Sequence, residues 1–364
     1  MQLKLHELRL RKDDPVLVIE DSYEIMGEHK RSYYALISQC NQNHHHFVFQ
    51  PENLENNHPW MDELNGLRET AYFCMRSVKN EIYEVHLKPT KEKTYFFGYI
   101  VKQDVFEKNM RDSVEELLHF RRLPLVLDLD DTLVRLVGEG NERFVPEADL
   151  PKCRDRVARL KDGRRIVLAE RVQEFLDWAQ NLFQISVCSL GDQEYVTNVV
   201  DVLDPLKTRI KGPIYSARHE HEYIRKSIDP SRPPKDLRAL FTYCNLTDNS
   251  FGSGTSLPLI LDDETRMWPA DQHDNIIEVI GQPNSSVWSV ALFPVVKDTL
   301  EHVHREFFRQ YDQWCLRSNE AKTRGQIYTR PGPSAVVMYK TYLRHILRDM
   351  IGKSPVYRNA APYA

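Results

Sequence analysis

The sequence predicts an α/β fold built on a doubly wound parallel sheet, with a β-rich domain before it and helices after it. Three observations predict this fold: alternating or aromatic runs before residue 108, continuous apolar runs between helical segments from residue 123, and helical periodicity after residue 285. The 364 residues suffice for two or three domains. We place the β-rich domain at 1–110, the α/β domain at 111–285, the helical addition at 286–353 and a tail at 354–364.

The N-terminal domain is predicted from short runs of strand-forming residues. These runs are Val16–Ile19, Tyr33–Ile37, His46–Phe49, Tyr72–Cys74, Ile82–His86 and Thr94–Val101. The three histidines His44–His46 lie in a run whose side chains would alternate between the two faces of a strand. Because neighbouring side chains of a strand point to opposite faces, these histidines cannot present three ligands to one metal ion. We therefore expect them to be structural or solvated.

The α/β domain is predicted to begin with a short linking helix. Ser113 and Glu116 have the spacing of a capping box in front of Leu117 and Leu118. The apolar runs that read as buried parallel strands are Leu123–Leu127, Ile185–Cys188 and Leu257–Leu261.

After residue 285 the periodicity becomes helical. One predicted helix carries Val296, Leu300, Val303, Phe307 and Tyr311 on a single face. A last helix follows the break at Arg330–Pro333, and we expect Ser334 and Gly352 to cap its two ends.

Charge, apolar run length and cysteine spacing limit the possible functions. The 49 basic and 53 acidic residues give a net charge of −4, which argues against direct nucleic-acid binding. The longest apolar runs are far shorter than the roughly 20 residues of a membrane helix, and we expect neither a span nor a signal peptide. The six cysteines form no C-x-x-C pair, so neither a disulfide framework nor a zinc ribbon is expected. We expect a reducing, intracellular setting.

Carboxylates directly follow the first buried strand of the α/β domain. The run Leu125–Leu127 continues into Asp128, Asp130, Asp131 and Thr132. Strand periodicity puts Asp128 and Asp130 on one side, and open α/β sheets bind ligands at the carboxyl ends of their strands. Two carboxylates packed there repel each other, so a proton or a cation is needed; a hard divalent ion such as Mg²⁺ fits oxygen ligands best. The alternative, that these aspartates merely cap a helix, does not explain so many of them after a buried strand.

Two further strand ends carry polar side chains. Asp262 and Asp263 follow Leu257–Leu261, and a meeting of this strand end with the first would create an acidic metal pocket. Ser189 ends the strand at Ile185–Cys188 and is followed by a predicted helix, Gln193–Leu203, whose N-terminal N–H groups favour an anion. Near this pocket, Trp268 is expected to be a core residue.

These segments together resemble one known family. Asp128-Leu-Asp130-Asp131-Thr132 matches the D-x-D-x-T signature of haloacid-dehalogenase superfamily phosphatases, in the branch that dephosphorylates the carboxy-terminal domain of RNA polymerase II. The resemblance covers roughly Leu123–Lys353. It continues through Val187–Gly191 with Asp204-Pro205, through Lys235–Phe241, through Leu259–Trp268 and through His304–Phe308.

The resemblance implies a set of site residues. Asp128 would be the nucleophile, and Asp130 would protonate the leaving oxygen and then activate water. Mg²⁺ would be bound by Asp128, by the backbone carbonyl of Asp130, by Asp262 and by Asp263 as a ligand or close partner. The phosphate would be held by Ser189 and Lys235, with Thr132 orienting the loop.

The resemblance also implies a substrate and a location, and it has one clear departure. It implies a Ser/Thr phosphatase acting on the phosphorylated polymerase tail in the nucleus, with the cytoplasm as the second option. The family's Arg-Pro-Gly before the helix preceding the second motif is absent, and Arg165 or Arg171 are the candidates to replace that arginine. The alternatives are a phosphatase of another phosphoprotein or a metabolite, and a catalytically silent binding module of the same fold. The sequence does not indicate an oligomeric state.

Overall fold

The structure is a computed structural model that describes the strands before residue 96 and residues 96–220, 233–245, 254–281 and 288–353. It divides into two compact units. The first consists mainly of the residues up to Asp112, and the second consists of Ser113–Arg218 and the residues from Pro233 onward. The four domain ranges given above stay predictions.

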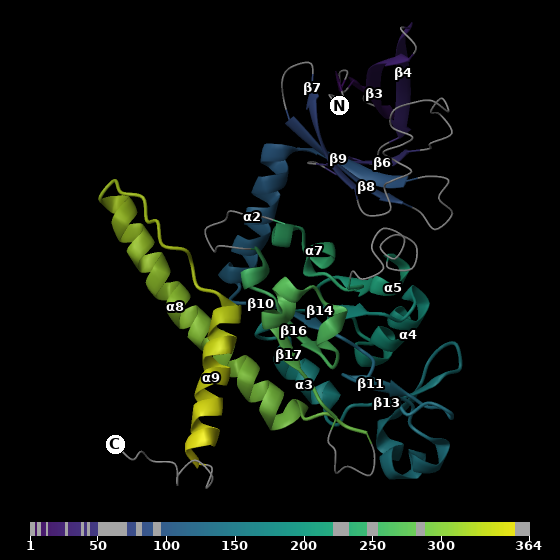
Figure 1. Cartoon of the computed structure of the whole chain (residues 1–364), viewed down its shortest axis with the longest axis vertical. Helices are drawn as coiled ribbons and strands as arrows, with labels where there is room; N and C mark the ends of the chain where they lie inside the picture. The colour runs from purple at the N-terminus through teal and green to yellow at the C-terminus, as the bar shows by residue number, and fades with distance from the viewer. Residues whose placement is uncertain are drawn as a thin grey trace, which may run out of the picture. The chain divides into compact units, whose positions relative to one another are not determined.

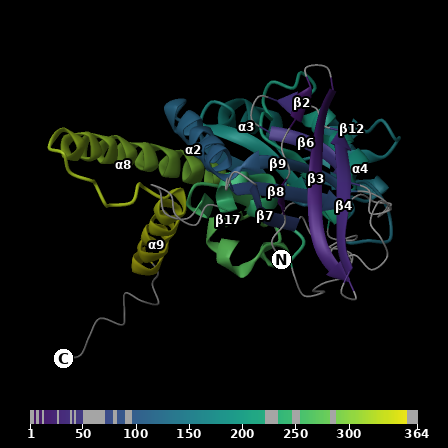
Figure 2. The ribbon, with the colours of Figure 1, turned by 90° about the horizontal axis from the view of Figure 1, so that it is seen from above.

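The first unit contains a nine-stranded sheet. Five of the six predicted strand runs lie within its strands, and the sixth, Thr94–Val101, coincides with β9 from Phe96 onward, its first two residues lying outside the described residues. The order of the sheet is β2-β3-β1-β7-β8-β9-β6-β5, with β4 paired to β3; the long β3–β4 pair is prominent in Figure 2. The three histidines His44–His46 lie in strand β6, which begins two residues before the predicted run His46–Phe49. The bounds are β1 Lys4–Leu5, β2 Arg9–Arg11, β3 Asp14–Ile25, β4 Glu28–Ile37, β5 Cys40–Asn41, β6 His44–Phe49, β7 Ala71–Ser77, β8 Ile82–Pro89 and β9 Phe96–Lys102.

The linking helix is longer than predicted. Helix α2 spans Gln103–His119, so Ser113 lies inside it and does not cap its start. The reason is that the buried face begins earlier: Met110 is already buried, one turn before Val114 and two turns before Leu117. The capping-box spacing at Ser113 therefore coincides with an ordinary helix interior.

The second unit is built on a five-stranded parallel sheet, which confirms the predicted fold class. Its strands are β10 Leu123–Leu127, β14 Phe183–Ser189, β15 Ile214–Ser216, β16 Leu259–Asp262 and β17 Ile276–Glu278. Their order is β15-β14-β10-β16-β17, and every neighbouring pair is parallel (Figure 1). The chain starts at the centre, winds outward through β14 and β15, and then returns to β16 on the other side of β10. The gap between β10 and β16 is thus the switch point, where sheets of this kind bind ligands.

Helices flank this sheet. They are α3 Val172–Ala179, α4 Gln193–Leu203, α5 Ala217–Glu220, α7 Leu237–Leu240, α8 Lys297–Thr323 and α9 Ala335–Lys353. Short helical turns lie at Glu147–Arg156, Thr242–Asn245, Gly254–Ser256, Thr265–Met267, Ala270–Asn275 and Leu292–Val296. Among the described residues, no helix is both long and apolar enough to cross a bilayer.

Helix α4 has the predicted limits, and its start has a clear cause. The Asp192 carboxylate accepts a hydrogen bond from the Tyr195 backbone N–H at 2.8 Å, as an N-cap residue does. The predicted apolar face of α8 is confirmed at Leu300, Val303 and Phe307, which are all buried. In both ribbon views the C-terminal part of α8 extends away from the sheet (Figures 1 and 2).

One of the two predicted caps of the last helix is wrong. The Ser334 hydroxyl accepts a hydrogen bond from the Val337 N–H at 3.2 Å, so Ser334 caps α9 as expected. Gly352 lies within α9, whose last residue is Lys353, so it is not the residue that ends the helix. A glycine near the end of an apolar periodic segment is compatible with either position.

The segment between β10 and α3 folds into a small antiparallel sheet. Its strands are β11 Val134–Leu136, β12 Val157–Arg159 and β13 Arg165–Leu168, in the order β11-β13-β12. Each has only three or four residues, too few for a visible alternation of apolar and polar side chains.

A buried aspartate holds the turn after α4. The Asp204 carboxylate accepts backbone N–H groups from Thr208, Arg209 and Ile210 at 2.9–3.0 Å and is 2% exposed. Burial alone would raise the pKa of Asp204, but the three N–H donors outweigh it and hold that pKa below its ordinary value.

We predict that Asp204→Ala lowers the free energy of unfolding by about 2–4 kcal/mol at pH 7, because three buried N–H groups lose a charged acceptor. Since the folded-state pKa is depressed, the contribution is complete above the unfolded-state value and is lost as the pH falls through the folded-state value. The difference from wild type should therefore shrink below about pH 4. Urea unfolding across pH measures it. The control is Asp201→Ala, which breaks a surface ion pair with Lys161 and should lower the free energy of unfolding by no more than about 1 kcal/mol. An equal loss of stability in both variants would contradict the role of Asp204 as the acceptor that holds this turn.

Candidate active site

Two carboxylates meet at the switch point of the parallel sheet. Asp128 directly follows β10 and Asp262 is the last residue of β16. The register aligns Leu127 with Leu261, and the Asp128 N–H donates to the Leu261 carbonyl at 2.9 Å. The side-chain carboxyl groups at the ends of β10 and β16 therefore lie side by side, as the sequence predicted.

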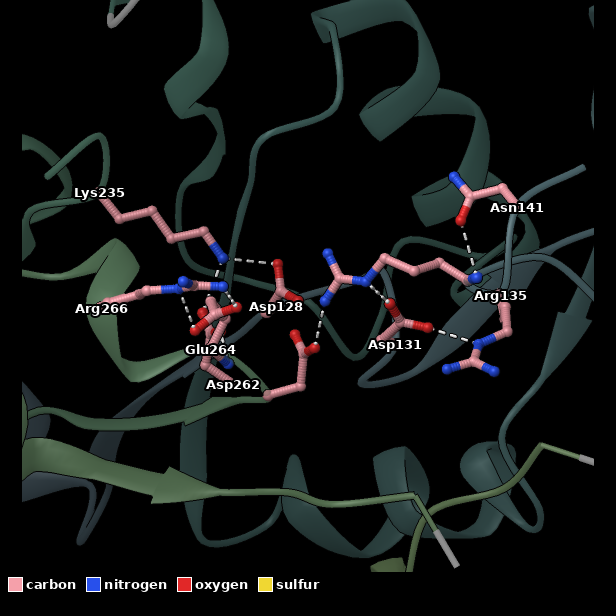
Figure 3. Close-up of polar contacts among 10 residues, drawn as sticks. Asp128, Asp131, Arg135, Asn141, Lys235, Asp262, Glu264 and Arg266 are labelled. Carbon is pink, nitrogen blue, oxygen red and sulfur yellow. Dashed lines mark hydrogen bonds and ion pairs between the residues drawn. The ribbon is translucent and has the colours of Figure 1, made fainter. Parts of the chain in front are cut away.

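A buried lysine joins these two carboxylates. Lys235 Nζ lies 2.7 Å from Asp128 Oδ1 and 2.7 Å from Asp262 Oδ2 (Figure 3). Lys235 is 2% exposed, Asp128 4% and Asp262 fully buried. An ammonium between two carboxylates gives each of the three buried groups an oppositely charged partner at close range. The Lys235 side chain therefore reaches the pocket.

The protonation of this cluster follows from burial and mutual charge. Burial disfavours the Lys235 ammonium, but the Asp128 and Asp262 carboxylates outweigh that effect and raise the pKa of Lys235. Burial raises the pKa of the Asp128 carboxyl well above its ordinary value, against the opposing effect of Lys235. The ammonium therefore stays charged at neutral pH, and it favours the ionised form of Asp128 against the larger effect of burial.

The neighbours of Lys235 fix its position. Its backbone N–H donates to the Met267 carbonyl at 3.0 Å. The next residue, Asp236, accepts from the Gln272 side chain at 2.7 Å, and Gln272 in turn accepts the Leu237 N–H at 2.9 Å. These contacts tie the start of α7 to the segment after β16.

Trp268 has a second role that its apolar character did not indicate. It is 1% exposed, as expected of a core residue. Its indole N–H, however, donates to Asp262 Oδ2 at 2.8 Å, the oxygen that also contacts Lys235. Trp268 therefore helps to stabilise the buried carboxylate and belongs to the site.

Asp130 faces a different set of neighbours. Its Oδ1 accepts the Tyr195 hydroxyl at 2.6 Å, and its Oδ2 accepts the Ser189 hydroxyl at 3.4 Å. Burial raises the pKa of Asp130, while the Tyr195 hydrogen bond opposes that rise. The structure thus brings predicted residues Asp130 and Ser189 together and adds Tyr195, which the sequence analysis missed.

A network of arginines lies at the edge of the cluster. Arg143 Nε is 2.8 Å from Asp131 Oδ2, and Arg143 Nη2 is 2.9 Å from Asp263 Oδ2. Arg135 Nε contacts the other oxygen of Asp131 at 2.5 Å (Figure 3). Burial and the charges of Asp262 and Asp131 raise the pKa of Asp263 to about 6, against the effect of Arg143. Asp131 has φ 61°, which turns the chain sharply after β10.

The arginines named as candidate substrate readers are engaged elsewhere. Arg165 pairs with Glu147, and Arg171 pairs with Glu174 and stacks over the Phe293 ring at 4.2 Å. Arg143 is the one that contacts a predicted metal ligand. The sequence carries no signal for the contact between Arg143 and Asp263. That contact depends on the path that the segment between β11 and β12 takes in the fold.

Thr132 lies in the turn that follows Asp128 and Asp130, but its side chain makes no hydrogen bond to the other described site residues. Its backbone N–H donates to the Leu129 carbonyl at 3.3 Å, within the turn after β10. Its hydroxyl is buried and has no hydrogen-bond partner among the described residues. A buried hydroxyl of this kind is available to a bound group.

The carboxylates fit a hard divalent cation. Asp128, Asp262 and Asp263 each offer an oxygen, and these oxygens lie within 4.8 Å of one another. Lys235 balances only part of their charge, and carboxylate oxygens are the ligands such ions prefer. The donor set, with no nitrogen or sulfur ligand in it, fits Mg²⁺ better than zinc or copper.

A doubly wound sheet whose switch point holds a buried aspartate, a lysine and an acidic cluster is the arrangement that the resemblance of the motifs implies. Residues 123–285 match the family model of the NLI interacting factor-like phosphatases. This part of the chain is therefore similar to that phosphatase family, in agreement with the resemblance of its motifs. The comparison with curated proteins found no match to the chain.

Two solved structures are similar to this chain over part of its length. One is an RNA polymerase II CTD phosphatase, Fcp1, from fission yeast bound to beryllium fluoride, with 16% identity and a TM-score of 0.40. The other is a structure of Fcp1 described as an essential RNA polymerase II CTD phosphatase, with 16% identity and a TM-score of 0.38. Each match covers 63% of this chain and 73% of the other.

We predict that Lys235→Met lowers the free energy of unfolding by about 3–5 kcal/mol at pH 7 in metal-free buffer, because it leaves Asp128 and Asp262 buried without their cation. The deficit should shrink as the pH falls, since the raised pKa of Asp128 lets that carboxyl take up a proton and lose its charge. Denaturant unfolding at several pH values measures both effects. Lys297→Met, which removes a part-buried lysine paired with Glu301, is the control and should cost about 1 kcal/mol. A deficit that does not depend on pH would contradict the charge argument.

Proposed function

We propose that this protein is a Mg²⁺-dependent phosphatase of phosphoserine and phosphothreonine in proteins, acting through an aspartyl-phosphate on Asp128. The observation that carries the proposal is the buried Asp128 carboxylate, held 2.7 Å from the Lys235 ammonium beside Asp262. A carboxylate fixed at a strand end, next to a cation that also attracts phosphate, is poised to attack phosphorus. The match of residues 123–285 to a phosphatase family model supports the same chemistry.

The roles of the chain's own residues follow from their positions. Asp128 forms the new bond to phosphorus while the bond from phosphorus to the seryl or threonyl oxygen breaks. Asp130 gives that departing oxygen a proton and later takes one from the water that hydrolyses the phospho-aspartate. Lys235 attracts the phosphate oxygens and favours the ionised form of Asp128, and the Ser189 hydroxyl is a further donor at the end of β14.

The metal would be held by Asp128, Asp262 and Asp263, with the Asp130 backbone carbonyl as a further oxygen. When bound, Mg²⁺ supplies charge that screens the anionic phosphate from the anionic nucleophile. Burial, and after it the neighbouring carboxylates, raise the pKa values of Asp128 and Asp263. This supports the proposal, because a bound cation would favour the ionised form of both groups.

The proposed substrate is the phosphorylated carboxy-terminal domain of RNA polymerase II, which would place the protein in the nucleus. Its support is the family match, and the two similar structures are themselves RNA polymerase II CTD phosphatases. We propose no direct contact with nucleic acid. The exposed guanidinium of Arg143, at the edge of the cluster, is the described cation best placed to meet a phosphopeptide.

We predict that the protein hydrolyses p-nitrophenyl phosphate and a phosphorylated polymerase-tail peptide only with Mg²⁺, and that Asp128→Asn lowers kcat at least about a thousandfold, because the bond-forming group is lost. Asp155→Asn, at an exposed carboxylate, is the control and should leave kcat unchanged. Steady-state assays with Mg²⁺ and with a chelator measure this. Preference for small phosphorylated metabolites would overturn the substrate, and no turnover by folded wild type would favour a silent binding module.

We predict that Asp263→Asn raises the Mg²⁺ concentration needed for half-maximal activity about 10- to 100-fold, with much of kcat regained at saturating metal. In wild type this concentration should rise below about pH 6, because the pKa of Asp263 is about 6 and its protonated form does not bind the ion. Metal titrations at several pH values measure both effects. Asp271→Asn, which breaks a surface pair with Arg238, is the control; an unchanged metal requirement in Asp263→Asn would exclude Asp263 from the site.

A further inference from the structure

Tyr195 is a buried residue that touches the proposed proton donor. It lies in the first turn of α4 and is 3% exposed. Its hydroxyl donates to Asp130 Oδ1 at 2.6 Å, whereas the Ser189 hydroxyl reaches the other oxygen only at 3.4 Å. The two oxygens of the Asp130 carboxyl are therefore held unequally.

The Tyr195 ring is confined by its surroundings. Gly191 lies against the ring edge, where an added Cβ would be 2.3 Å from Tyr195 Cδ1. The Arg164 guanidinium carbon lies over the ring, 4.7 Å from its centroid, within the range of a cation–π contact. Arg164 is itself held by Asp162, whose carboxylate accepts its Nε–H at 2.8 Å. The ring therefore has little freedom to swing away from Asp130.

The backbone of the same turn is also fixed. The Asp192 carboxylate accepts the Tyr195 N–H, and the Ser216 hydroxyl donates to the Gly191 carbonyl at 2.6 Å. Burial and the nearby Asp130 carboxylate raise the pKa of Tyr195, so the phenol keeps its proton. In its contact with Asp130 the hydroxyl is a donor and the carboxyl oxygen is an acceptor.

We propose that Tyr195 is a positioning residue that holds Asp130 by Oδ1 and so directs Oδ2 toward the leaving oxygen of the substrate. This inference rests on the proposed phosphatase function. In the first step, Asp128 forms a bond to phosphorus, the bond from phosphorus to the ester oxygen breaks, and that oxygen takes the proton from Oδ2 of Asp130. The resulting Asp130 carboxylate keeps the Tyr195 hydrogen bond, which stabilises the charge that this step creates.

The test compares substrates that need the proton to different degrees. A p-nitrophenolate leaves without a proton, whereas phenolate and especially a seryl alkoxide need one. Because kcat/KM includes only steps up to the first irreversible one, it reports the cleavage in which Asp130 is the acid. We expect Tyr195→Phe to lower kcat/KM about tenfold or more for phenyl phosphate and for a phosphoserine peptide, and by less than about threefold for p-nitrophenyl phosphate.

Two further variants make the test specific. Tyr339→Phe removes the hydroxyl of another buried tyrosine, in α9, and should change none of the three values. Gly191→Ala keeps the Tyr195 hydroxyl but forces its ring to move, so it should produce the same selective loss. It also serves as the second variant if Tyr195→Phe does not fold, as judged by its thermal unfolding.

The outcomes separate this inference from the function on which it rests. A selective loss with poor leaving groups supports the role of Tyr195. Equal losses with all three substrates, or no loss with any, would mean that Tyr195 only packs in the core and would overturn the inference while the phosphatase function stands. A folded wild type that hydrolyses none of the three would instead overturn the proposed function itself.

Discussion

The buried Lys235 ammonium between Asp128 and Asp262 is the contact on which the rest of the site depends. Parallel pairing of β10 with β16 forces the two carboxyl groups together at the switch point, where both are out of contact with water. Burying two carboxylates side by side is too costly in free energy unless a cation contacts them. The hydrogen bonds of Asp236, Gln272 and Trp268 around this cluster have the common effect of keeping that cation and its partners in place.

Different surroundings give the carboxylates of one small region different properties. Asp128 faces a lysine, Asp130 faces the Tyr195 and Ser189 hydroxyls, and Asp263 faces Arg143 and the open edge of the cluster. The same side chain can therefore be a nucleophile, a proton donor or a metal ligand, according to the cations and donors that its environment provides. In many active sites, two carboxyl groups with different neighbours have different pKa values, so that one acts as an acid and the other as a nucleophile or base.

The parts predictable from sequence were those with local signals. The strand Leu123–Leu127 and the helix Gln193–Leu203 have the predicted limits, because continuous apolar residues and an Asp192 cap fix them locally. The start of α2 and the β11–β13 sheet were not predicted, since a misleading capping pattern and very short strands gave no usable signal. Lys235 could be named only by resemblance, and the contacts of Tyr195 and Arg143 depend on how separate segments fold against one another.

The most direct test of the account is to trap the covalent species during turnover. Rapid acid quenching of the enzyme with substrate and Mg²⁺, followed by peptide mapping with mass spectrometry, locates any phosphate bound to the chain. The account predicts phosphate on Asp128 and none in the Asp128→Asn variant. Phosphate on another residue, or steady turnover with no phosphorylated peptide at any time point, would contradict it and would indicate direct attack by water.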